Sequence, residues 1–318
     1  MTTVPSDAPR SGLVSVVVPV YNEADGLREF HRRLSGALVG ETHEILLVDD
    51  GSSDGTAELL RELAAEDRAV RPVRLSRNFG HQAALSAGME LARGNAVVTI
   101  DADLQDPPEF IPVLLAAWRQ GADVVHATRT VRPGEPRLRL VLIRIFYGLF
   151  ARLSSMPSFP GNAGDFRLMS RVALDALLSL PERNRFLRGL AAWVGFRQVS
   201  LVYERDPRYA GESKYPFTKL VRLALDGIVS FSTAPLRVSA LLGVLFAGLA
   251  FLAIPVVVVL RLAGLYAVSG IASVHILVLG LGGLQMIFLG VIGEYLARSY
   301  DEAKGRPVYL LAPDTDEA

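Results

Sequence analysis

The chain has 318 residues, of which 50% are hydrophobic, and its 33 basic side chains balance its 33 acidic ones. This charge balance argues against a nucleic-acid-binding protein, which usually carries a basic excess. The sequence contains no cysteine, so disulfides, cysteine-ligated zinc and thiol catalysis are excluded.

The first two hundred residues carry the pattern of a globular domain. Residues 1–12, MTTVPSDAPRSG, are polar, lack the apolar core of a signal peptide and are predicted to form a disordered tail. Beyond them, near-continuous apolar strands alternate with helices, which predicts an α/β fold with a mostly parallel sheet covered on both faces. The predicted strands are 13–20, 44–50, 70–75, 95–101 and 123–128, and the predicted helices are 25–39, 55–66, 80–93 and 108–119.

Polar side chains follow each predicted strand. Ligands of parallel α/β sheets bind beyond the carboxyl ends of the strands, so these segments are predicted to share one binding rim. Acidic and basic groups both converge on it. The segments are PVYNE (19–23), DDGSSDGT (49–56), SRNFGHQAA (76–84), DADLQDPP (101–108) and Arg129.

The most acidic of these segments, DADLQDPP, has two interpretations. Asp106 before Pro107 and Pro108 is typical of a helix start, so the segment is a polar turn with a helix cap. Alternatively, its carboxylates hold a divalent metal and a phosphorylated substrate. The turn VYNEADG after the first strand lacks the G-x-G-x-x-G pattern of dinucleotide-binding proteins, and the chain contains no P-loop motif. A metal ion on aspartates is the alternative way to neutralise a diphosphate.

Residues 215–237 precede the most apolar part of the chain. Lys219, Arg222 and Asp226 fall at helical spacing on one face, and apolar side chains dominate the other. This pattern predicts an amphipathic helix lying in the membrane surface. The alternative is an ordinary helix packed on the globular domain.

Two long apolar stretches, 238–260 and 271–293, contain no formal charge. Each is long enough to cross about 30 Å of hydrocarbon as a helix, and together they predict a transmembrane hairpin over 238–296. Basic residues cluster before the first span and after the second, which predicts a cytoplasmic catalytic domain with both termini cytoplasmic. Residues 297–318 are the predicted C-terminal tail.

Seven segments in this order resemble a known family. VVVPVYNE, LLVDDGSSDGT, SRNFGHQAAL and DADLQDPPE are similar to the motifs of family 2 glycosyltransferases with the GT-A fold. GDFRLMSR (164–171), RYAGESKY (208–215) and SFSTAPLR (230–237) resemble its dolichyl-phosphate mannose synthase branch, and within that branch the bacterial polyprenyl-phosphate glycosyltransferases. The resemblance runs from about residue 13 to about residue 300 and implies a GT-A catalytic domain over 13–214.

The resemblance also implies a donor site with a bound metal. DADLQ is similar to the family's metal motif, in which Asp101, Asp103 and Gln105 would hold Mg²⁺ or Mn²⁺. Under this reading the loop has both identities, because Asp106 and the two prolines start the next helix. The residues expected to bind the donor nucleotide sugar are Pro19, Tyr21, Asn22, Glu23, Asp49, Asp50, Asp101 and Asp103.

The acceptor implied by the resemblance is a polyprenyl phosphate. Because a phosphate oxygen is already anionic, no strong general base is required, and Asp165 is expected to orient groups in preference to abstracting a proton. An ion pair of Arg167 with Asp165 and direct contact of Arg167 with substrate are both open. Asp103, Arg129 and Asp165 are the expected catalytic residues; Arg129, Arg139, Arg144, Arg167, Arg208, Ser213 and Lys214 are the expected acceptor-binding residues.

The implied reaction is transfer of a hexose, by preference from UDP-glucose, to polyprenyl phosphate with inversion to a β-linked product. A GDP-mannose-dependent enzyme is the first alternative. A processive polysaccharide synthase would be expected to carry a Q-x-x-R-W motif, which the chain lacks. A non-catalytic membrane scaffold is the remaining alternative. The expected partners are the donor, the lipid phosphate and the bilayer of the cytoplasmic membrane, with a homo-oligomer left open.

Overall fold

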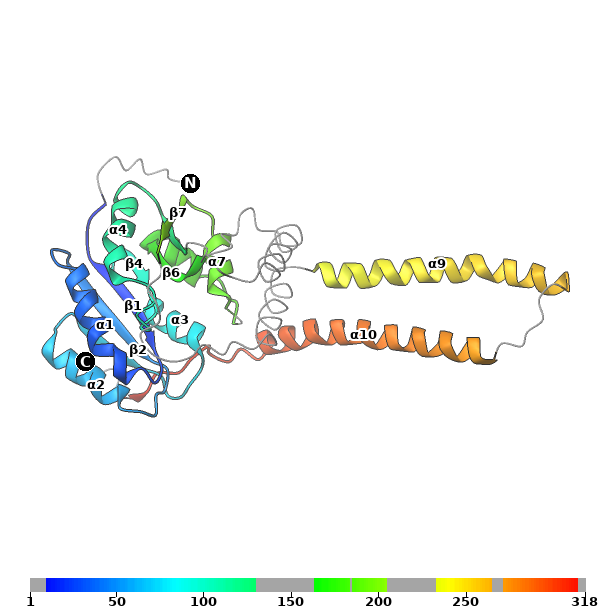
Figure 1. The fold of residues 1–318 in the computed structure, drawn as a ribbon, viewed down its shortest axis with the longest axis horizontal. Helices are drawn as coiled ribbons and strands as arrows, with labels where there is room; N and C mark the ends of the chain where they lie inside the picture. Colours follow the sequence, from blue (N-terminus) through cyan, green and yellow to red (C-terminus); the bar gives the residue numbers. More distant parts are fainter. Residues whose placement is uncertain (1–9, 130–162, 184, 205–232, 265–270, 314–318) are drawn as a thin grey trace. The chain divides into compact units, whose positions relative to one another are not determined.

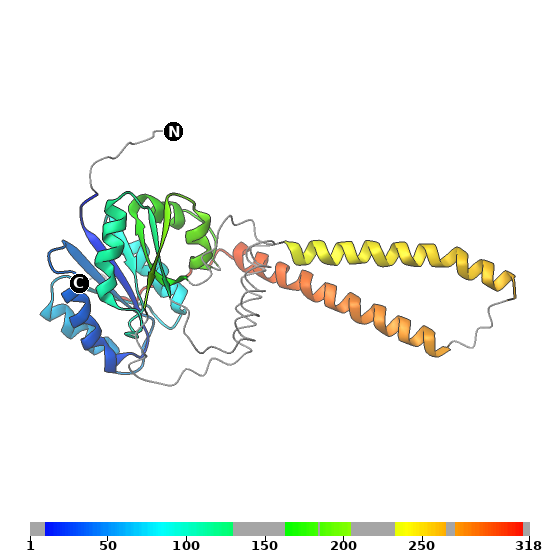
Figure 2. The ribbon, with the colours of Figure 1, turned by 45° about the horizontal axis from the view of Figure 1, so that its top comes forward.

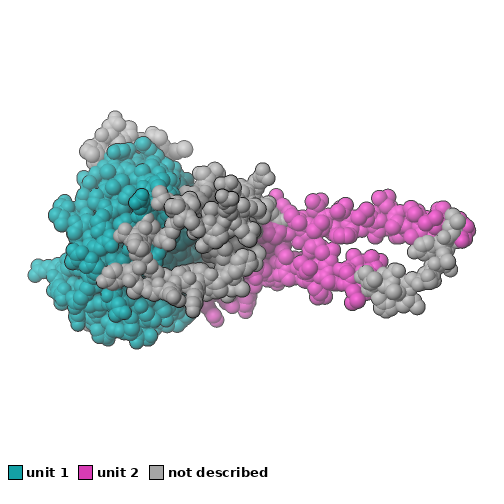
Figure 3. Space-filling view, in the orientation of Figure 1, with its two compact units in different colours: residues 1–151, 156–216, 307–318 teal, residues 152–155, 217–306 magenta. Residues whose placement is uncertain are grey.

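The computed structural model describes residues 10–129, 163–183, 185–204, 233–264 and 271–313. The chain forms two compact units, coloured teal and magenta in Figure 3. Unit 1 comprises Met1–Ala151, Met156–Pro216 and Pro307–Ala318, and unit 2 comprises Arg152–Ser155 and Phe217–Arg306.

Unit 1 is built on a seven-stranded sheet with the order β3-β2-β1-β4-β6-β5-β7 (Figure 1). Every neighbouring pair runs parallel except the two pairs formed by β6, which are antiparallel. The predicted α/β fold with a mostly parallel sheet is therefore confirmed. The strands are β1 (Val14–Val20), β2 (His43–Asp49), β3 (Val70–Arg74), β4 (Ala96–Thr99), β5 (Val124–Arg129), β6 (Ala163–Ser170) and β7 (Gln198–Tyr203).

Helices cover both faces of the sheet (Figure 2). Apolar side chains of α1, α2 and α4 share one buried cluster with alternate residues of β1 and β2, such as Val16 and Ile45. The next residues along these strands point to the opposite face, where α3 packs closely. A Cβ on Gly88 of α3 would lie 2.3 Å from Cγ1 of Val17. The helices of unit 1 are α1 (Ala24–Ala37), α2 (Thr56–Glu66), α3 (His81–Leu91), η1 (Pro108–Phe110), α4 (Ile111–Arg119), α6 (Arg171–Leu178) and α7 (Leu187–Trp193).

The five predicted strands and four predicted helices lie within two residues of their observed bounds. Strands β6 and β7 and helices α6 and α7 had no counterpart among the predicted elements. The segment GDFRLMSR proves to be mostly the antiparallel strand β6, which separates β4 from β5. The loop after β4 and the end of β5 are therefore not on adjacent strands.

Unit 2 contains two long apolar helices that contact one another, α9 (Ala234–Leu262) and α10 (Ile271–Ala303) (Figure 1). Each contains a stretch long and apolar enough to cross a membrane, at Pro235–Leu260 and Leu277–Ala303. The predicted apolar span ends at residue 293, but helix α10 continues through a more polar segment to Ala303. In this segment, Arg298 and Glu294 form an i,i+4 ion pair at 3.1 Å. Of the predicted surface helix 215–237, only 233–237 lie among the described residues, and 234–237 belong to α9.

The segment after α10 returns to unit 1. The N–H of Ser76 donates to the carbonyl of Leu310 at 2.9 Å, and the N–H of Ala312 donates to the carbonyl of Arg74 at 2.8 Å. Leu311 thus forms an antiparallel bridge with Leu75, just beyond β3. The hydroxyl of Tyr309 donates to Oε2 of Glu90 on α3 at 2.6 Å.

Candidate active site

The candidate site lies where the strand order reverses. From β1 the chain passes to β2 and β3 on one side, and then crosses to β4 on the other side of β1. In open α/β sheets ligands bind in the crevice that this reversal opens at the carboxyl ends of the strands. The loops after β1 and β4, which begin at Tyr21 and Ile100, flank this point.

The loop after β1 is braced by the loop after β2. Asn22 adopts a positive φ of 53°, which is uncommon for a residue other than glycine. Its N–H donates to Oγ of Ser52 at 3.0 Å, and its side-chain oxygen accepts from the N–H of Ser53 at 2.9 Å. Tyr21 beside it is 47% exposed, whereas Pro19 is buried within β1. Tyr21 can therefore contact a ligand, and Asn22 is occupied with fixing the loop.

Asp50 is also a structural anchor. Its carboxylate accepts from the N–H groups of Phe79 and Gly80 at 2.7 and 2.9 Å. Burial raises the pKa of Asp50, and the two N–H donors only partly oppose this. The Asp50 carboxylate thus ties the loop after β3 to the end of β2.

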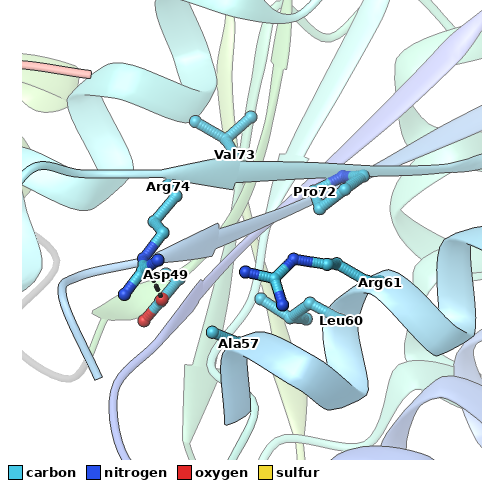
Figure 4. Close-up of a pocket in the computed structure, with 7 residues that line it drawn as sticks. All are labelled: Asp49, Ala57, Leu60, Arg61, Pro72, Val73 and Arg74. Carbon is cyan, nitrogen blue, oxygen red and sulfur yellow. Dashed lines mark ion pairs between the residues drawn. The ribbon is translucent and has the colours of Figure 1, made fainter. Parts of the chain in front are cut away.

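Asp49 lines a small cavity at the end of β2 (Figure 4). Its Oδ1 accepts from the N–H of Ser52 at 2.8 Å. Its Oδ2 is buried and accepts no hydrogen bond from the described residues, although Nε of Arg74 lies 3.5 Å away. A buried carboxylate oxygen that accepts no hydrogen bond from the described residues favours a ligand that offers an N–H donor. The cavity measures about 50 Å³ and is lined by Asp49, Ala57, Leu60, Arg61, Pro72, Val73 and Arg74.

The turn after β4 is tight. Leu104 is buried with a positive φ of 59°, and the N–H of Gln105 donates to Oδ1 of Asp103 at 3.1 Å. Asp101 and Asp103 are both partly exposed. In the part of the chain that the structure describes, no three or more His, Cys, Asp or Glu side chains are gathered as a metal site. Two carboxylates and an amide nevertheless suit Mg²⁺ or Mn²⁺, which take few protein ligands when phosphate and water complete the shell.

His81, the first residue of α3, joins two of these acids. Its Nε2 lies 2.8 Å from Oδ1 of Asp101, and its Nδ1 lies 4.0 Å from Oδ2 of Asp165 on β6. Burial lowers the pKa of His81, but the hydrogen bond and charge of Asp101 outweigh this, so the pKa is raised. His81 therefore lies between the two carboxylates and is hydrogen-bonded to Asp101.

Asp165 is held between two arginines. Its Oδ1 accepts from Nη2 of Arg167 at 2.8 Å, and Arg188 of α7 donates to both of its oxygens at 3.1 and 2.7 Å. Burial acts to raise the pKa of Asp165, but the charges of Arg188 and Arg167 hold it well below its usual range. A carboxylate in this state orients cations and accepts a proton poorly.

Arg167 is buried, and its Nη1 donates to the carbonyl of Leu187 at 2.8 Å. The structure thus contains the ion pair with Asp165, which was one of the two alternatives for this residue. Contact of Arg167 with a substrate remains a prediction. His126 on β5 is paired with Arg167 across the sheet and is also buried.

Arg129, at the end of β5, is bound by two buried side chains. Its Nη2 lies 3.3 Å from Oδ2 of Asp106, and its Nε donates to the hydroxyl of Tyr203 at 3.2 Å. That hydroxyl in turn donates to Oδ1 of Asp106 at 2.5 Å. The prediction that Asp106 caps a helix is therefore wrong. The helix begins at Pro108 without a side-chain cap, because the Asp106 carboxylate turns to Tyr203 and Arg129 instead.

The structure places the predicted residues of the described region at one end of the sheet. It also adds His81, Arg188 and Tyr203, which had no assigned role. His81 lies in a segment that was assigned to the binding rim, whereas Arg188 and Tyr203 lie on elements that were not predicted. Outside the described residues lie Arg139, Arg144, Arg208, Ser213 and Lys214.

Comparison with known proteins gives relatives over almost the whole chain. A bactoprenol glucosyl transferase of Shigella phage SfV is 42% identical over 94% of this chain and 97% of its own length. A prophage bactoprenol glucosyl transferase homolog of Escherichia coli is 41% identical over 94% and 98%. An uncharacterized glycosyltransferase of Bacillus subtilis is 44% identical over 93% and 92%.

Among solved structures, a mannosyl-3-phosphoglycerate synthase from Rubrobacter xylanophilus is similar at 23% identity. The match covers 67% of this chain and 71% of that one, with a TM-score of 0.45. The family model described as "Glycosyl transferase family 2" matches residues 15–178, which is more than half of the chain. The chain therefore belongs to glycosyl transferase family 2.

Proposed function

We propose that this glycosyltransferase moves glucose from UDP-glucose to a polyprenyl phosphate at the membrane surface. Support comes from relatives that are named as bactoprenol glucosyl transferases and match 94% of the chain at 41–42% identity. The observation that carries the proposal is the pairing of an acid- and arginine-rich rim with an apolar helical hairpin in one chain. A GDP-mannose donor is the alternative.

The nucleotide end of the donor would lie over the ends of β1 and β2. Asp49 supports this placement, because its Oδ2 can accept an N–H from a nucleobase. Tyr21 is exposed beside it and offers a ring for stacking. Asp101, Asp103 and Gln105 would hold a divalent ion, either Mg²⁺ or Mn²⁺. When bound, that ion offsets the negative charge of the departing diphosphate.

The acceptor phosphate would approach from the Arg129 side. Its anionic oxygen attacks the anomeric carbon, the bond between that carbon and the diphosphate oxygen breaks, and the electron pair leaves with the nucleoside diphosphate. No proton transfer is needed, because the phosphate is ionised near neutral pH. Arg129 orients the phosphate by charge-assisted hydrogen bonds. Asp165 holds Arg188 and Arg167 in place, and a single displacement gives the β-linked product.

The hairpin would keep this rim at the bilayer, where the lipid phosphate lies. We propose a catalytic domain over 13–214, a surface helix over 215–237 and a membrane hairpin over 238–296. Unit 1 includes residues up to Pro216 and from Pro307 onward, so the chain enters and leaves the hairpin from the same unit, which supports both ends of the hairpin lying on one side. The charge bias of the flanking segments supports a cytoplasmic location for that side.

The test is a transfer assay in detergent with purified full-length protein and undecaprenyl phosphate. Radiolabelled UDP-glucose, UDP-galactose, UDP-GlcNAc and GDP-mannose are offered separately, with Mg²⁺, with Mn²⁺ or with EDTA. Lipid-extractable label from UDP-glucose that EDTA abolishes is the expected result. Label from GDP-mannose alone would favour the alternative donor, and no label from any donor would contradict the proposal.

A further inference from the structure

The guanidinium of Arg129 is held by neighbouring residues that have no assigned part in the reaction. The carboxylate of Asp106 is fully buried, Tyr203 is 4% exposed, and each contacts the guanidinium of Arg129. The third of these neighbours is Gly164. We call Asp106, Tyr203 and Gly164 the Arg129 anchor.

The anchor fixes the guanidinium from two sides. Asp106 contacts Nη2 and Tyr203 contacts Nε, while the hydroxyl of Tyr203 also donates to Asp106. The three polar groups thus close a ring of hydrogen bonds, which restricts the rotamers of a long side chain. Among the described residues, these contacts use two of the five N–H donors of Arg129. The Arg129 side chain is 29% exposed, so the other donors remain available to an anion.

Gly164 makes room for this arrangement. A Cβ at this position would lie 2.8 Å from Nη2 of Arg129, closer than a Cβ carbon approaches other heavy atoms. The guanidinium would have to leave its place beside Asp106. Gly164 directly precedes Asp165, so the first residues of strand β6 both accommodate Arg129 and present the carboxylate that binds Arg188.

Tyr203 is itself held by aromatic packing. Its ring centroid lies 5.6 Å from that of Phe166 and 5.4 Å from that of Phe110. Burial and the neighbouring Asp106 carboxylate raise the pKa of Tyr203, so its hydroxyl stays a donor to Asp106. The ring is therefore fixed by its neighbours independently of its hydroxyl group.

We infer that Asp106, Tyr203 and Gly164 are positioning residues that orient Arg129 toward the phosphate of the acceptor lipid. The inference rests on the proposed function for the identity of that anion. An arginine that is already oriented loses less entropy when it binds phosphate than a free surface arginine does. The anchor thus acts on acceptor affinity and leaves donor binding unchanged.

The test compares Tyr203→Phe and Gly164→Ala with Tyr309→Phe. Tyr203→Phe removes only the hydroxyl, and the packing against Phe110 and Phe166 remains. Tyr309→Phe is the matched control, because it removes a tyrosine–carboxylate hydrogen bond of similar length to Glu90. Binding of undecaprenyl phosphate in detergent is measured for each protein, together with KM for both substrates and the melting temperature.

We expect Tyr203→Phe and Gly164→Ala to weaken undecaprenyl phosphate binding and to raise its KM roughly 5- to 10-fold. The donor KM should stay within about twofold, and Tyr309→Phe should leave both constants unchanged. Equal acceptor affinity in Tyr203→Phe and wild type would overturn the inference, as would a wild type that binds no undecaprenyl phosphate. Weakened binding by the two variants without transfer by the wild type would support the anchor and contradict the proposed function.

Discussion

Arg188 donates to both carboxylate oxygens of Asp165, from Nε to Oδ1 at 3.1 Å and from Nη2 to Oδ2 at 2.7 Å. Arg167 binds the same carboxylate at 2.8 Å from within the sheet. The two arginines keep the Asp165 carboxylate ionised and fix its orientation. This pairing explains how a carboxylate can be central to the site and yet serve poorly as a base.

Replacement of Asp165 by Asn should lower both stability and activity. It leaves the buried Arg167 without its anionic partner, which is expected to cost about 3 kcal/mol in the free energy of unfolding. Glu58→Gln is the control, because its pairing with Arg61 at 3.7 Å is exposed, and it should change stability by at most about 0.5 kcal/mol. Denaturant unfolding in detergent measures the stability of both variants, and the transfer assay measures their activity. Equal stability of Asp165→Asn and Glu58→Gln would contradict the structural role.

Stability should fall between pH 6.5 and pH 4 because of His126. Burial lowers the pKa of His126 to about 4, opposed by the hydrogen bond to Gln198 and assisted by Arg167. Below pH 6.5 His126 becomes protonated in the unfolded chain but stays neutral in the folded chain. The contribution of His126 to the free energy of unfolding is therefore fully present above pH 6.5 and is lost as the pH falls. The loss reaches about 3 kcal/mol.

His126→Gln tests this, since it cannot titrate. The difference in unfolding free energy between wild type and variant should therefore change steadily from pH 7 to pH 4. His81 works in the opposite sense, because its pKa is raised, but it is present in both proteins and cancels. A difference that is constant over this range would show that His126 has the same pKa in the folded and the unfolded chain, which would contradict the prediction.

Activity should depend on a divalent metal through Asp103. Asp103→Asn is expected to lower kcat roughly 100-fold and to raise the metal concentration that gives half-maximal rate. Asp175→Asn provides the control, because this carboxylate lies on α6 and is exposed. Transfer rates are measured over a titration of Mg²⁺ and of Mn²⁺. An unchanged metal dependence in Asp103→Asn would remove this residue from the metal site.

Two glycines should respond oppositely to alanine. Gly88→Ala places a methyl 2.3 Å from Val17 and 2.9 Å from Val48, so it should destabilise the fold by about 1–3 kcal/mol. Gly36→Ala lies on α1 with no atom within 4 Å of the new Cβ, and it should stabilise the fold by about 0.5–1 kcal/mol. Thermal unfolding ranks the two variants against wild type. The reverse order would contradict the packing of α3 on the sheet.

Local patterns were sufficient to predict much of the fold. Apolar runs such as 13–20 and 44–50 became buried parallel strands, because a short continuous apolar run rich in β-branched residues is typical of a covered strand. Strand β7, in contrast, is only partly buried at the edge of the sheet, and its pattern was not recognised. The loops at the strand ends were predicted as a rim because parallel strands point the same way.

Except for the ion pair of Arg167 with Asp165, which was one of two alternatives, the pairings within the site could not be predicted, since they join residues far apart in the chain. Asp106 illustrates the reason. An aspartate before two prolines carries a local helix-start signal, but its carboxylate binds Tyr203, 97 residues away. Arg188 likewise gave no local signal, because only the fold brings α7 to β6. Sequence therefore predicted the acids of the rim together with Arg129 and Arg167, and missed Arg188 and Tyr203, which hold them in place.

The most direct test of the account is the structure of the lipid product formed from UDP-[¹³C]glucose and undecaprenyl phosphate. Mass spectrometry gives the number of phosphates, and the one-bond carbon–proton coupling at the anomeric carbon gives its configuration. The expected product is undecaprenyl monophosphate carrying one β-linked glucose. A diphosphate-linked sugar or an α-linkage would contradict direct attack of the lipid phosphate on the anomeric carbon.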